Sequence, residues 1–299
     1  MAHLRFDTAL SRCRSETMLG WPDHKNWDWT LKASLVILFS WPPAKGGGDF
    51  PAAIKLTKQL AKDGSRLRAL ARVLLSNPEL KDAYTALLGS LRLGATSNHK
   101  KSILITSTQP NEGKTTVASC LAVTASLAGQ TVLLIDGDLR RRGLASAAGV
   151  VDGIGLTEIL EGDVEADEAI QPVELFEDGR VAGTLSIIAA GRRPPEILPA
   201  VDWPRARSTF RGIAERFGIV LFDSPPILAA NDALLLAGIV DGILLIVDAG
   251  AADRHQVRRA KEQLDSIGTP VIGAVLNQFD PKVHGQSSQP YRDYYLARS

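Results

Sequence analysis

The chain has 299 residues and a formal net charge of +1, a length that suffices for one large α/β domain with appendages. Apolar residues make up 45% and charged residues 22%, an ordinary globular balance, and the near-neutral charge gives no indication of nucleic acid or an anionic membrane as the main partner. The two cysteines, Cys13 and Cys120, lie far apart with no histidine cluster around them, which argues against a disulfide framework or a zinc site and fits a reducing compartment.

Residues 1–50 form an N-terminal segment that carries no motif and for which no structure is predicted apart from one apolar run. Its apolar run at residues 35–39 is much shorter than the ~18–20 residues needed to span a bilayer. This run therefore predicts a buried strand or a patch that faces a partner, and any location at a membrane is expected to depend on another protein.

Residues 51–98 are predicted to form a helical arm, because leucines recur in it at helical spacing. Gly64 and the pair Asn77 and Pro78 divide the arm into two or three helices. The leucines that set the spacing are Leu67, Leu70 and Leu74.

Between residues 99 and 280, short β-rich runs alternate with helical patterns. Six of these runs are nearly continuous in isoleucine, valine and leucine, which is typical of strands buried on both faces of a parallel sheet. The alternation predicts an α/β fold with a doubly wound, mostly parallel sheet and helices on both faces, followed by a flexible tail at residues 281–299. The six runs cover residues 102–106, 131–135, 185–189, 218–222, 242–247 and 270–276.

Residues 103–116 read as a strand, a tight loop and the start of a helix, the arrangement of a P-loop NTPase. Such a loop aims free backbone N–H groups and the positive end of the helix dipole at a phosphate. Gly113 lets the backbone come close, Lys114 can neutralise phosphate oxygens, and the Thr115 hydroxyl can bind Mg²⁺. The usual pattern has another glycine five residues before Gly113, where this chain has Thr108.

Two of the predicted strands end in aspartate, which the phosphate loop makes significant. The first delivers Asp136, with Asp138 expected on the same strand face because strand side chains alternate. The second ends in Asp223. Ligands of doubly wound sheets bind outside the carboxyl ends of the strands, and carboxylates beside a Mg²⁺-phosphate can hold the metal, orient it or accept a proton.

Residues 108–116, 134–141 and 222–226 resemble the three nucleotide motifs of the bacterial tyrosine kinases, the cytoplasmic ATPase domains of capsular and exopolysaccharide assembly systems. Residues 190–198 and 273–277 are similar to two further blocks of that family. The resemblance implies an ATP-dependent tyrosine autokinase that uses ATP and Mg²⁺, works at the inner face of the plasma membrane and depends on a membrane-spanning activator of polysaccharide assembly.

The resemblance also assigns roles to individual residues. It implies Lys114, Asp136 and Asp138 as the catalytic set, although the spacing alone allows either aspartate as proton acceptor. It implies Thr115, Asp136 and Asp223 as the groups that hold the metal. Nucleotide binding is implied for Asn111, Glu112, Gly113, Lys114, Thr115 and Thr116, with Asn277 placed to meet the adenine base.

Kinases of this family phosphorylate tyrosines in their own C-terminal tails, passing between neighbours in a ring. The chain has only four tyrosines, and the resemblance implies that Tyr291, Tyr294 and Tyr295 near its end are the phosphoacceptors. The family's Glu-x-x-Arg-x-x-Arg motif, which packs subunits into the ring, is reduced here to Asp82 because both arginine positions differ. Those positions hold Thr85 and Leu88, which puts ring formation in doubt.

Two alternatives compete with the kinase hypothesis. One is a partition or cell-division ATPase that switches as a dimer, but those relatives carry a second lysine where this chain has Gln109. The other is a scaffold of the polysaccharide machinery that binds ATP without catalysis, which the loss of the paired arginines favours.

Overall fold

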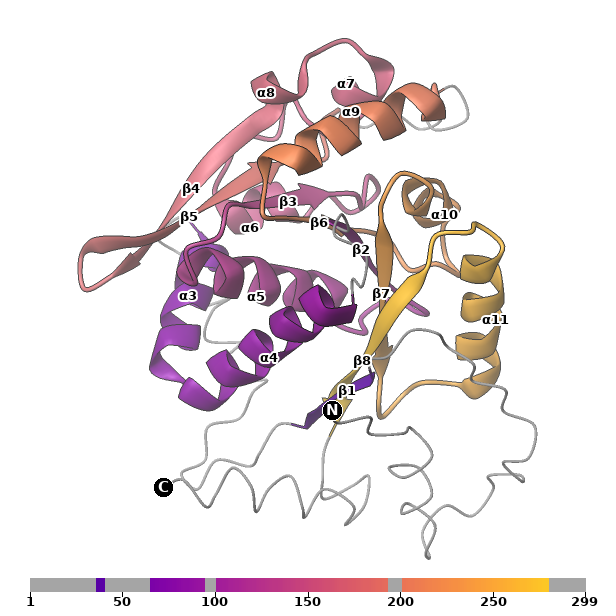
Figure 1. Cartoon of the computed structure of the whole chain (residues 1–299), viewed down its shortest axis with the longest axis horizontal. Coiled ribbons are helices and arrows are strands. Elements are labelled where there is room, and N and C mark those ends of the chain that lie inside the picture. The colour runs from indigo at the N-terminus through magenta and orange to yellow at the C-terminus, as the bar shows by residue number, and fades with distance from the viewer. Residues whose placement is uncertain (1–35, 41–64, 95–100, 193–200, 280–299) are drawn as a thin grey trace, which may run out of the picture.

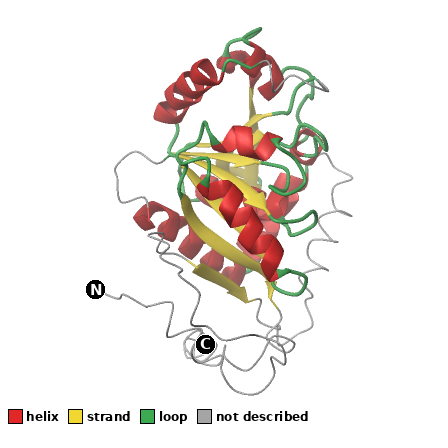
Figure 2. Ribbon diagram, turned by 90° about the vertical axis from the view of Figure 1, so that its right-hand side faces the viewer, coloured by secondary structure: helices red, strands yellow, loops and turns green. Residues whose placement is uncertain are grey.

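The computed structural model describes residues 36–40, 65–94, 101–192 and 201–279, and they form an eight-stranded sheet with helices on both faces (Figures 1 and 2). The strand order is β1-β8-β7-β2-β6-β3-β5-β4, and neighbours run parallel except β4, which is antiparallel to β5. The strands are β1 (Val36–Ser40), β2 (Ser102–Ser107), β3 (Val132–Asp136), β4 (Ile170–Glu177), β5 (Arg180–Ile188), β6 (Ile219–Asp223), β7 (Gly242–Asp248) and β8 (Val271–Phe279). The predicted fold class is confirmed.

Helices cover the sheet in two layers, as Figure 1 shows. One face packs against α3 (Arg66–Ser76), α4 (Pro78–Gly94), α5 (Lys114–Leu127) and α6 (Leu144–Ala148). The other packs against α7 (Leu156–Glu161), α8 (Ala166–Ala169), α9 (Trp203–Arg216), α10 (Asp232–Ala237) and α11 (Arg254–Asp265). None of the helices in the described ranges is long and apolar enough to cross a membrane.

The central strands are buried on both sides, which explains their nearly continuous apolar sequences. In β2, Ile103 and Ile105 join the core under α5, while Leu104 between them joins the core on the opposite face. The same alternation holds in β3, where Leu134 and Leu133 point to opposite layers. Six predicted runs and the short run at residues 35–39 are confirmed as strands.

Helices α3 and α4 separate where the sequence predicts a break. The side chain of Ser65 accepts a hydrogen bond from the backbone N–H of Arg68 and caps α3. The side-chain oxygen Oδ1 of Asn77 accepts a hydrogen bond from the N–H of Leu80 at 3.1 Å, and Pro78 occupies the first helical position, so α4 starts directly after α3 ends. Gly64 and residues 52–63 lie outside the described residues.

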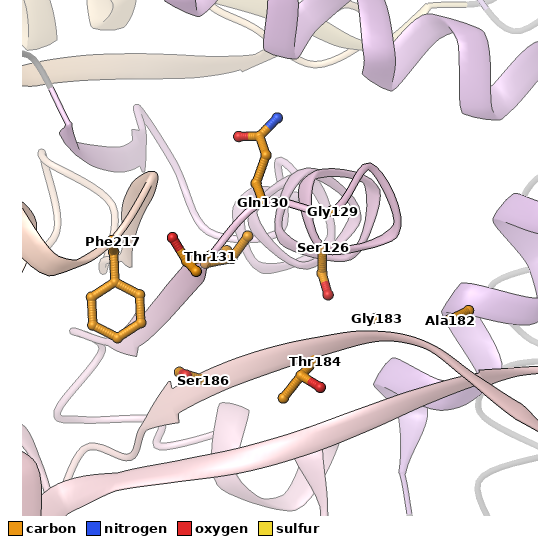
Figure 3. A pocket seen from close by; sticks show the side chains of 10 residues that line it. Ser126, Gly129, Gln130, Thr131, Ala182, Gly183, Thr184, Ser186 and Phe217 are labelled. Carbon is orange, nitrogen blue, oxygen red and sulfur yellow. The ribbon is translucent and has the colours of Figure 1, made fainter.

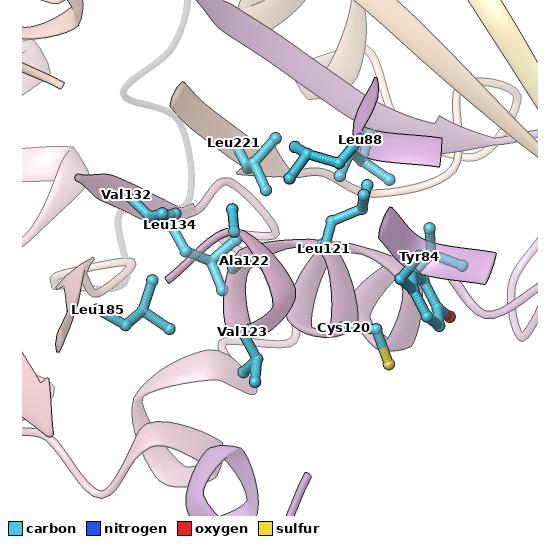
Figure 4. Close-up of a cluster of buried hydrophobic side chains, with 14 of the residues drawn as sticks. Tyr84, Leu88, Cys120, Leu121, Ala122, Val123, Val132, Leu134, Leu185 and Leu221 are labelled. Carbon is cyan, nitrogen blue, oxygen red and sulfur yellow. The ribbon is translucent and has the colours of Figure 1, made fainter. Parts of the chain in front are cut away.

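The buried face of α4 packs onto α5, the helix that follows the phosphate loop (Figure 4). Tyr84 is fully buried and its hydroxyl is hydrogen-bonded to the Cys120 thiol, and burial raises the pKa of that thiol to about 12. Cys120 is therefore an un-ionised core residue.

The apolar runs of the sequence did not predict one strand of the described fold, β4. β4 forms the edge of the sheet as a hairpin with β5, and its buried Val173 and Leu175 alternate with exposed residues. The predicted strands are continuous apolar runs, and an edge strand with one solvated face does not produce such a run. For the same reason the run predicted at residues 185–189 marks only the buried end of β5, which begins at Arg180.

Candidate nucleotide site

The phosphate loop joins the carboxyl end of β2 to the amino end of α5. Gly113 caps the helix with φ 92°, in the left-handed region that favours glycine, and Asn111 has φ 69°. Lys114 opens the helix and is buried, Thr115 is exposed and Thr116 is half-buried. The free N–H groups of this first turn point to the edge of the sheet where a phosphate would bind.

Glu112 holds the loop together from within, which the sequence did not reveal. One carboxylate oxygen accepts a hydrogen bond from the Thr108 hydroxyl at 2.7 Å, and the other accepts from the backbone N–H of Gln109 at 2.9 Å. The N–H of Asp248 at the end of β7 also donates to this carboxylate, at 3.4 Å. Thr108, which replaces the expected glycine, is therefore part of the loop's own bonding, and bonds to a carboxylate are among the stronger ones.

Strand β8 supports the loop from outside. The Asn277 side-chain amide donates to the carbonyl oxygen of Glu112 at 2.8 Å, and the Gln278 amide donates to that of Asn111 at 3.2 Å. A Cβ on Gly113 would lie 2.1 Å from the Asn277 amide nitrogen, so this close approach also requires glycine. Asn277 thus lies against the phosphate loop, and its contact with adenine stays a prediction.

The two aspartate-tipped strands lie side by side, and Asp136 of β3 is in register with Asp223 of β6. The N–H of Gly137 donates to the carbonyl oxygen of Asp223 at 2.7 Å. A Cβ on Gly137 would lie 2.8 Å from that oxygen, so only glycine permits the approach. The carboxyl ends of β2, β3 and β6 therefore bring the phosphate loop and both acids to one edge, as predicted.

Asp136 is almost completely buried, and burial raises its pKa to about 6. Its carboxylate accepts hydrogen bonds from the N–H groups of Leu144 at 2.9 Å and Asp138 at 3.2 Å, which counter that rise. The prediction that Asp138 lies on the same strand face as Asp136 was wrong. β3 ends at Asp136, so Asp138 lies in the following turn and its carboxylate accepts from the N–H of Arg141 at 3.1 Å.

Asp223 carries the clearest sign of a ligand site. It is buried beneath the loop, and one of its carboxylate oxygens has no hydrogen-bond partner. Burial raises its pKa to about 7, while a hydrogen bond from the Thr115 side chain and the charge of Lys114 oppose the rise. Burial likewise lowers the pKa of Lys114, opposed by the charges of Asp223 and Asp138. A buried, unpaired carboxylate is costly unless a cation joins it.

The acids fit a magnesium ion that arrives with a nucleotide. Within the described ranges no group of three or more His, Cys, Asp or Glu side chains is arranged to hold a metal. Mg²⁺ is usually bound by one or two carboxylates together with substrate phosphates and water. Asp136 and Asp223 supply that number, and the Thr115 hydroxyl lies beside Asp223.

A cavity of about 300 Å³ lies away from this edge, between the end of α5 and the start of β5 (Figure 3). Its lining includes Ser126, Gln130, Thr131 and Thr184 and contains no charged side chain. A site without a cation does not suit phosphates. The candidate nucleotide site is therefore the edge at the phosphate loop rather than this cavity.

A further acid, Glu158, anchors the segment that begins at residue 190. Its carboxylate accepts from the N–H groups of Gly155 at 2.8 Å and Arg192 at 3.0 Å, and from the Arg192 guanidinium at 2.7 Å. Gly191 has φ 87° and no room for a Cβ against Glu158. Residues 193–198 of this sequence block lie outside the described residues, as do Tyr291, Tyr294 and Tyr295.

The comparisons agree with this geometry. Residues 103–296 match the model of the CobQ/CobB/MinD/ParA nucleotide binding domain. The tyrosine-protein kinase YwqD of Bacillus subtilis (strain 168) is 30% identical over 196 residues, which cover 66% of this chain and 80% of YwqD. The kinase domain of Escherichia coli tyrosine kinase ETK superposes with a TM-score of 0.58 at 29% identity, covering 66% of this chain and 74% of that one.

Fold and site together define a P-loop nucleotide-binding protein with two acidic strand ends. The chain belongs to the CobQ/CobB/MinD/ParA nucleotide-binding family and, within it, to the bacterial tyrosine kinases. The resemblance read from the sequence motifs is thus confirmed. The cell division ATPase MinD of Pyrococcus furiosus superposes with a TM-score of 0.53 at 22% identity, covering 66% of this chain and 80% of that one, a likeness of fold alone.

Proposed function

We propose that this chain is an ATP-dependent tyrosine autokinase that transfers the γ-phosphate of ATP to Tyr291, Tyr294 and Tyr295 in its own tail. The observation that carries the proposal is the meeting of Lys114 with the buried, partly unpaired Asp223 at one sheet edge, in a member of the tyrosine kinase family. Three of the chain's four tyrosines lie in its last nine residues, which supports the tail as acceptor.

Each group has a task in the proposed transfer. The first turn of α5 and Lys114 hold the β- and γ-phosphates, while Thr115, Asp136 and Asp223 provide the oxygens for Mg²⁺. Bound Mg²⁺ would neutralise charge that develops on the phosphate oxygens. Asp136 or Asp138 accepts the phenol proton as the tyrosine oxygen attacks the γ-phosphorus and ADP leaves. Because burial raises the pKa of Asp136 to about 6, this carboxylate is a stronger base than an exposed one.

The cellular role that we propose is control of capsular or exopolysaccharide synthesis and export, together with a membrane-spanning activator at the cytoplasmic face of the plasma membrane. Membership of the tyrosine kinase family and the resemblance of the motifs to polysaccharide-assembly kinases support this role. Assembly into a homo-oligomer is part of the same proposal, although the changed residues of α4 do not favour the family's ring. The proposal includes no nucleic-acid partner.

The partition-type ATPase is the weaker candidate. Gln109 stands where such proteins carry a second lysine, and its side-chain amide bonds to Gln256 of α11 within the same chain. An uncharged side chain that is already bonded cannot supply the missing cation. The non-catalytic scaffold differs from the kinase only in lacking transfer, so the same experiment separates the two.

Phosphopeptide analysis of the full chain with Mg-ATP tests the proposal. We expect phosphate on the three tail tyrosines of the wild type and at most about one hundredth as much on Lys114→Met. Each protein is assayed with and without the membrane partner, to measure activation. Nucleotide binding without phosphotyrosine under every condition would favour the scaffold. Nucleotide-dependent dimerisation with steady hydrolysis and no phosphotyrosine would favour the partition-type ATPase.

A further inference from the structure

We infer that the cavity between the end of α5 and the start of β5 is a binding site for a neutral monosaccharide, separate from the nucleotide site. Three features carry this assignment: polar groups of the lining that have no partner, the lack of charge around them, and one aromatic ring. The site lies outside the machinery proposed for phosphate transfer and does not depend on it.

The cavity exists because β5 is longer than its neighbour β3. Val132, the first residue of β3, pairs with Leu185, whereas β5 begins five residues earlier at Arg180. Residues 180–184 therefore have β4 on one side and no described strand on the other. The turn that joins α5 to β3 borders this gap, where a space of about 300 Å³ remains. Backbone groups of residues 182–184 that point away from β4 are available to a ligand in this space.

Two side chains of the lining carry buried polar atoms without a partner. Ser126, in the last turn of α5, is 2% exposed, and its hydroxyl makes no hydrogen bond within the described residues. The same holds for the side-chain amide oxygen of Gln130 in the turn that follows. Figure 3 shows the Ser126 side chain directed toward the strand that carries Gly183 and Thr184. A buried polar atom without a partner is costly, and a ligand that bonds to it removes that cost.

The chemistry of the lining favours a neutral ligand. The described side chains around the cavity carry no charge, and α5 turns its carboxyl end toward it. The dipole of the helix places negative partial charge at that end, which disfavours an anion. The lining offers hydroxyl groups, an amide and strand backbone groups, so a suitable ligand both donates and accepts hydrogen bonds.

An aromatic ring narrows the class of ligand further. Phe217, the residue that follows α9, is half-buried and lines the cavity. The face of an aromatic ring carries partial negative charge and attracts the weakly positive C–H groups of a sugar ring. The volume lies at the lower end of the range of about 300–1,000 Å³ that is typical of ligand pockets, which suits one ring rather than a chain. A neutral monosaccharide combines such a C–H face with hydroxyls that donate and accept.

Helix α5 separates this site from the nucleotide site. Lys114 opens the helix and Ser126 follows it by twelve residues, a distance of about 18 Å along the helix axis. The two ligands therefore occupy opposite ends of one helix and do not compete for the same groups. Mg-ADP is expected to leave the sugar in place, which distinguishes this cavity from a site that accepts the ribose of a nucleotide.

An NMR titration of the isotopically labelled full-length chain tests the site. Glucose, galactose, mannose and N-acetylglucosamine are added one at a time. We expect at least one to give saturable shifts in the backbone signals of residues 126–132 and 182–186, with a dissociation constant on the order of millimolar for so small a ligand. The 6-phosphate of the sugar that binds should bind about tenfold more weakly, and saturating Mg-ADP should leave the affinity within about twofold. No saturable shift with any of the four sugars, shifts confined to other residues, or equal binding of the 6-phosphate overturns the inference.

Variants of the lining supply a second readout. Ser126→Ala removes the unpaired hydroxyl, so the affinity for the sugar should fall by roughly five- to tenfold while the denaturant midpoint of the free protein stays the same or rises. Thr184→Trp, at an exposed position of the lining, narrows the cavity and should abolish the saturable shifts. Thr124→Val is the matched control, because it removes another unpaired buried hydroxyl of α5 that lies outside the lining, and its affinity should stay within about twofold.

Wild-type affinity in either Ser126→Ala or Thr184→Trp contradicts the assignment of the sugar to this cavity. Lys114→Met should bind the sugar as wild type does, because its substitution lies at the other end of α5. Failure of tail phosphorylation therefore bears on the proposed function alone, and failure of sugar binding bears on this site alone.

Discussion

Two aspartates lie at opposite ends of the parallel strands. Asp241 has a structural role, whereas the surroundings of Asp223 suit it to bind a ligand. Asp241, just before β7, accepts bonds from the backbone N–H groups of Lys101 and Ser102 at 3.0 and 2.9 Å and from the Ser102 hydroxyl at 2.7 Å. Asp223, at the carboxyl end of β6, is more deeply buried and has an oxygen without a partner.

The difference lies in what each carboxylate is paired with. Asp241 joins the start of β2 to the start of β7 through three hydrogen bonds that all reach one of its carboxylate oxygens, and its side chain is only half-buried. Burial raises the pKa of Asp223 to about 7, and one of its carboxylate oxygens has no partner within the protein. A cation or a water bound to that cation would provide the missing partner. The comparison teaches that a buried carboxylate oxygen without a partner at a strand end, rather than acidity alone, marks the site.

The largest effect is expected from Lys114→Met, which removes the cation at the functional edge. Phosphate transfer should fall by roughly a hundredfold to a thousandfold, because this amine stabilises charge on the transferred group. Rates of tail phosphorylation at saturating Mg-ATP measure the loss. Lys101→Met, at the opposite edge, is the matched control and should retain wild-type transfer.

Asp223→Asn and Asp241→Asn are expected to act with opposite signs. Asp223→Asn should lower transfer by about ten- to a hundredfold, as losses around metal sites do, yet raise the free energy of unfolding of the nucleotide-free protein. Asp241→Asn should leave transfer within about twofold and lower the free energy of unfolding by about 1 kcal/mol, because charge-assisted bonds become neutral ones. Denaturant unfolding and kinase assays on the same preparations check both, and equal signs would remove the distinction between the edges.

The pH dependence of stability sharpens the same contrast. A carboxyl group whose pKa is raised on folding favours its protonated form in the folded state, so its contribution is highest below the unfolded pKa near 4. That contribution is lost as the pH rises from about 4 through the folded pKa of about 7 for Asp223. The stability gain of Asp223→Asn over wild type should therefore be near zero at pH 4 and grow to a plateau above pH 7, on the order of 4 kcal/mol. A gain that is constant with pH would contradict the burial effect.

The smallest effect concerns the bonding inside the phosphate loop. Thr108→Val leaves the Glu112 carboxylate without one hydrogen bond, which should cost about 1–2 kcal/mol of stability and raise KM for ATP several-fold with little change in kcat. Thr108→Ser keeps the hydroxyl and should restore both values. Loss of activity in Thr108→Ser as well would show that the methyl group, rather than the bond to Glu112, determines the loop.

The sequence was sufficient for the fold class, because strands buried on both faces are continuous in apolar residues and the central strands here are of that kind. It was insufficient for β4, where solvent on one face breaks the run. Strand order was also out of reach, since nothing local records that β6 lies between β2 and β3.

For the site, the sequence was sufficient to predict Asp136 and Asp223, because each ends a recognisable strand, and Lys114, because it follows a strand and a tight loop. It could not supply the bond between Asn277 and Glu112, which joins residues 165 positions apart and depends on the register of β8. It also misjudged Asp138, because the strand that was assumed to carry this residue ends at Asp136.

Transfer of the γ-phosphate from isotopically labelled ATP to the tail, measured side by side for wild type, Asp223→Asn and Asp241→Asn, tests the central claim most directly. The claim is that the edge formed by β2, β3 and β6 performs the transfer. It predicts label on Tyr291, Tyr294 and Tyr295 in wild type and in Asp241→Asn, and at most about one tenth of that label in Asp223→Asn. Equal labelling of all three proteins would contradict it.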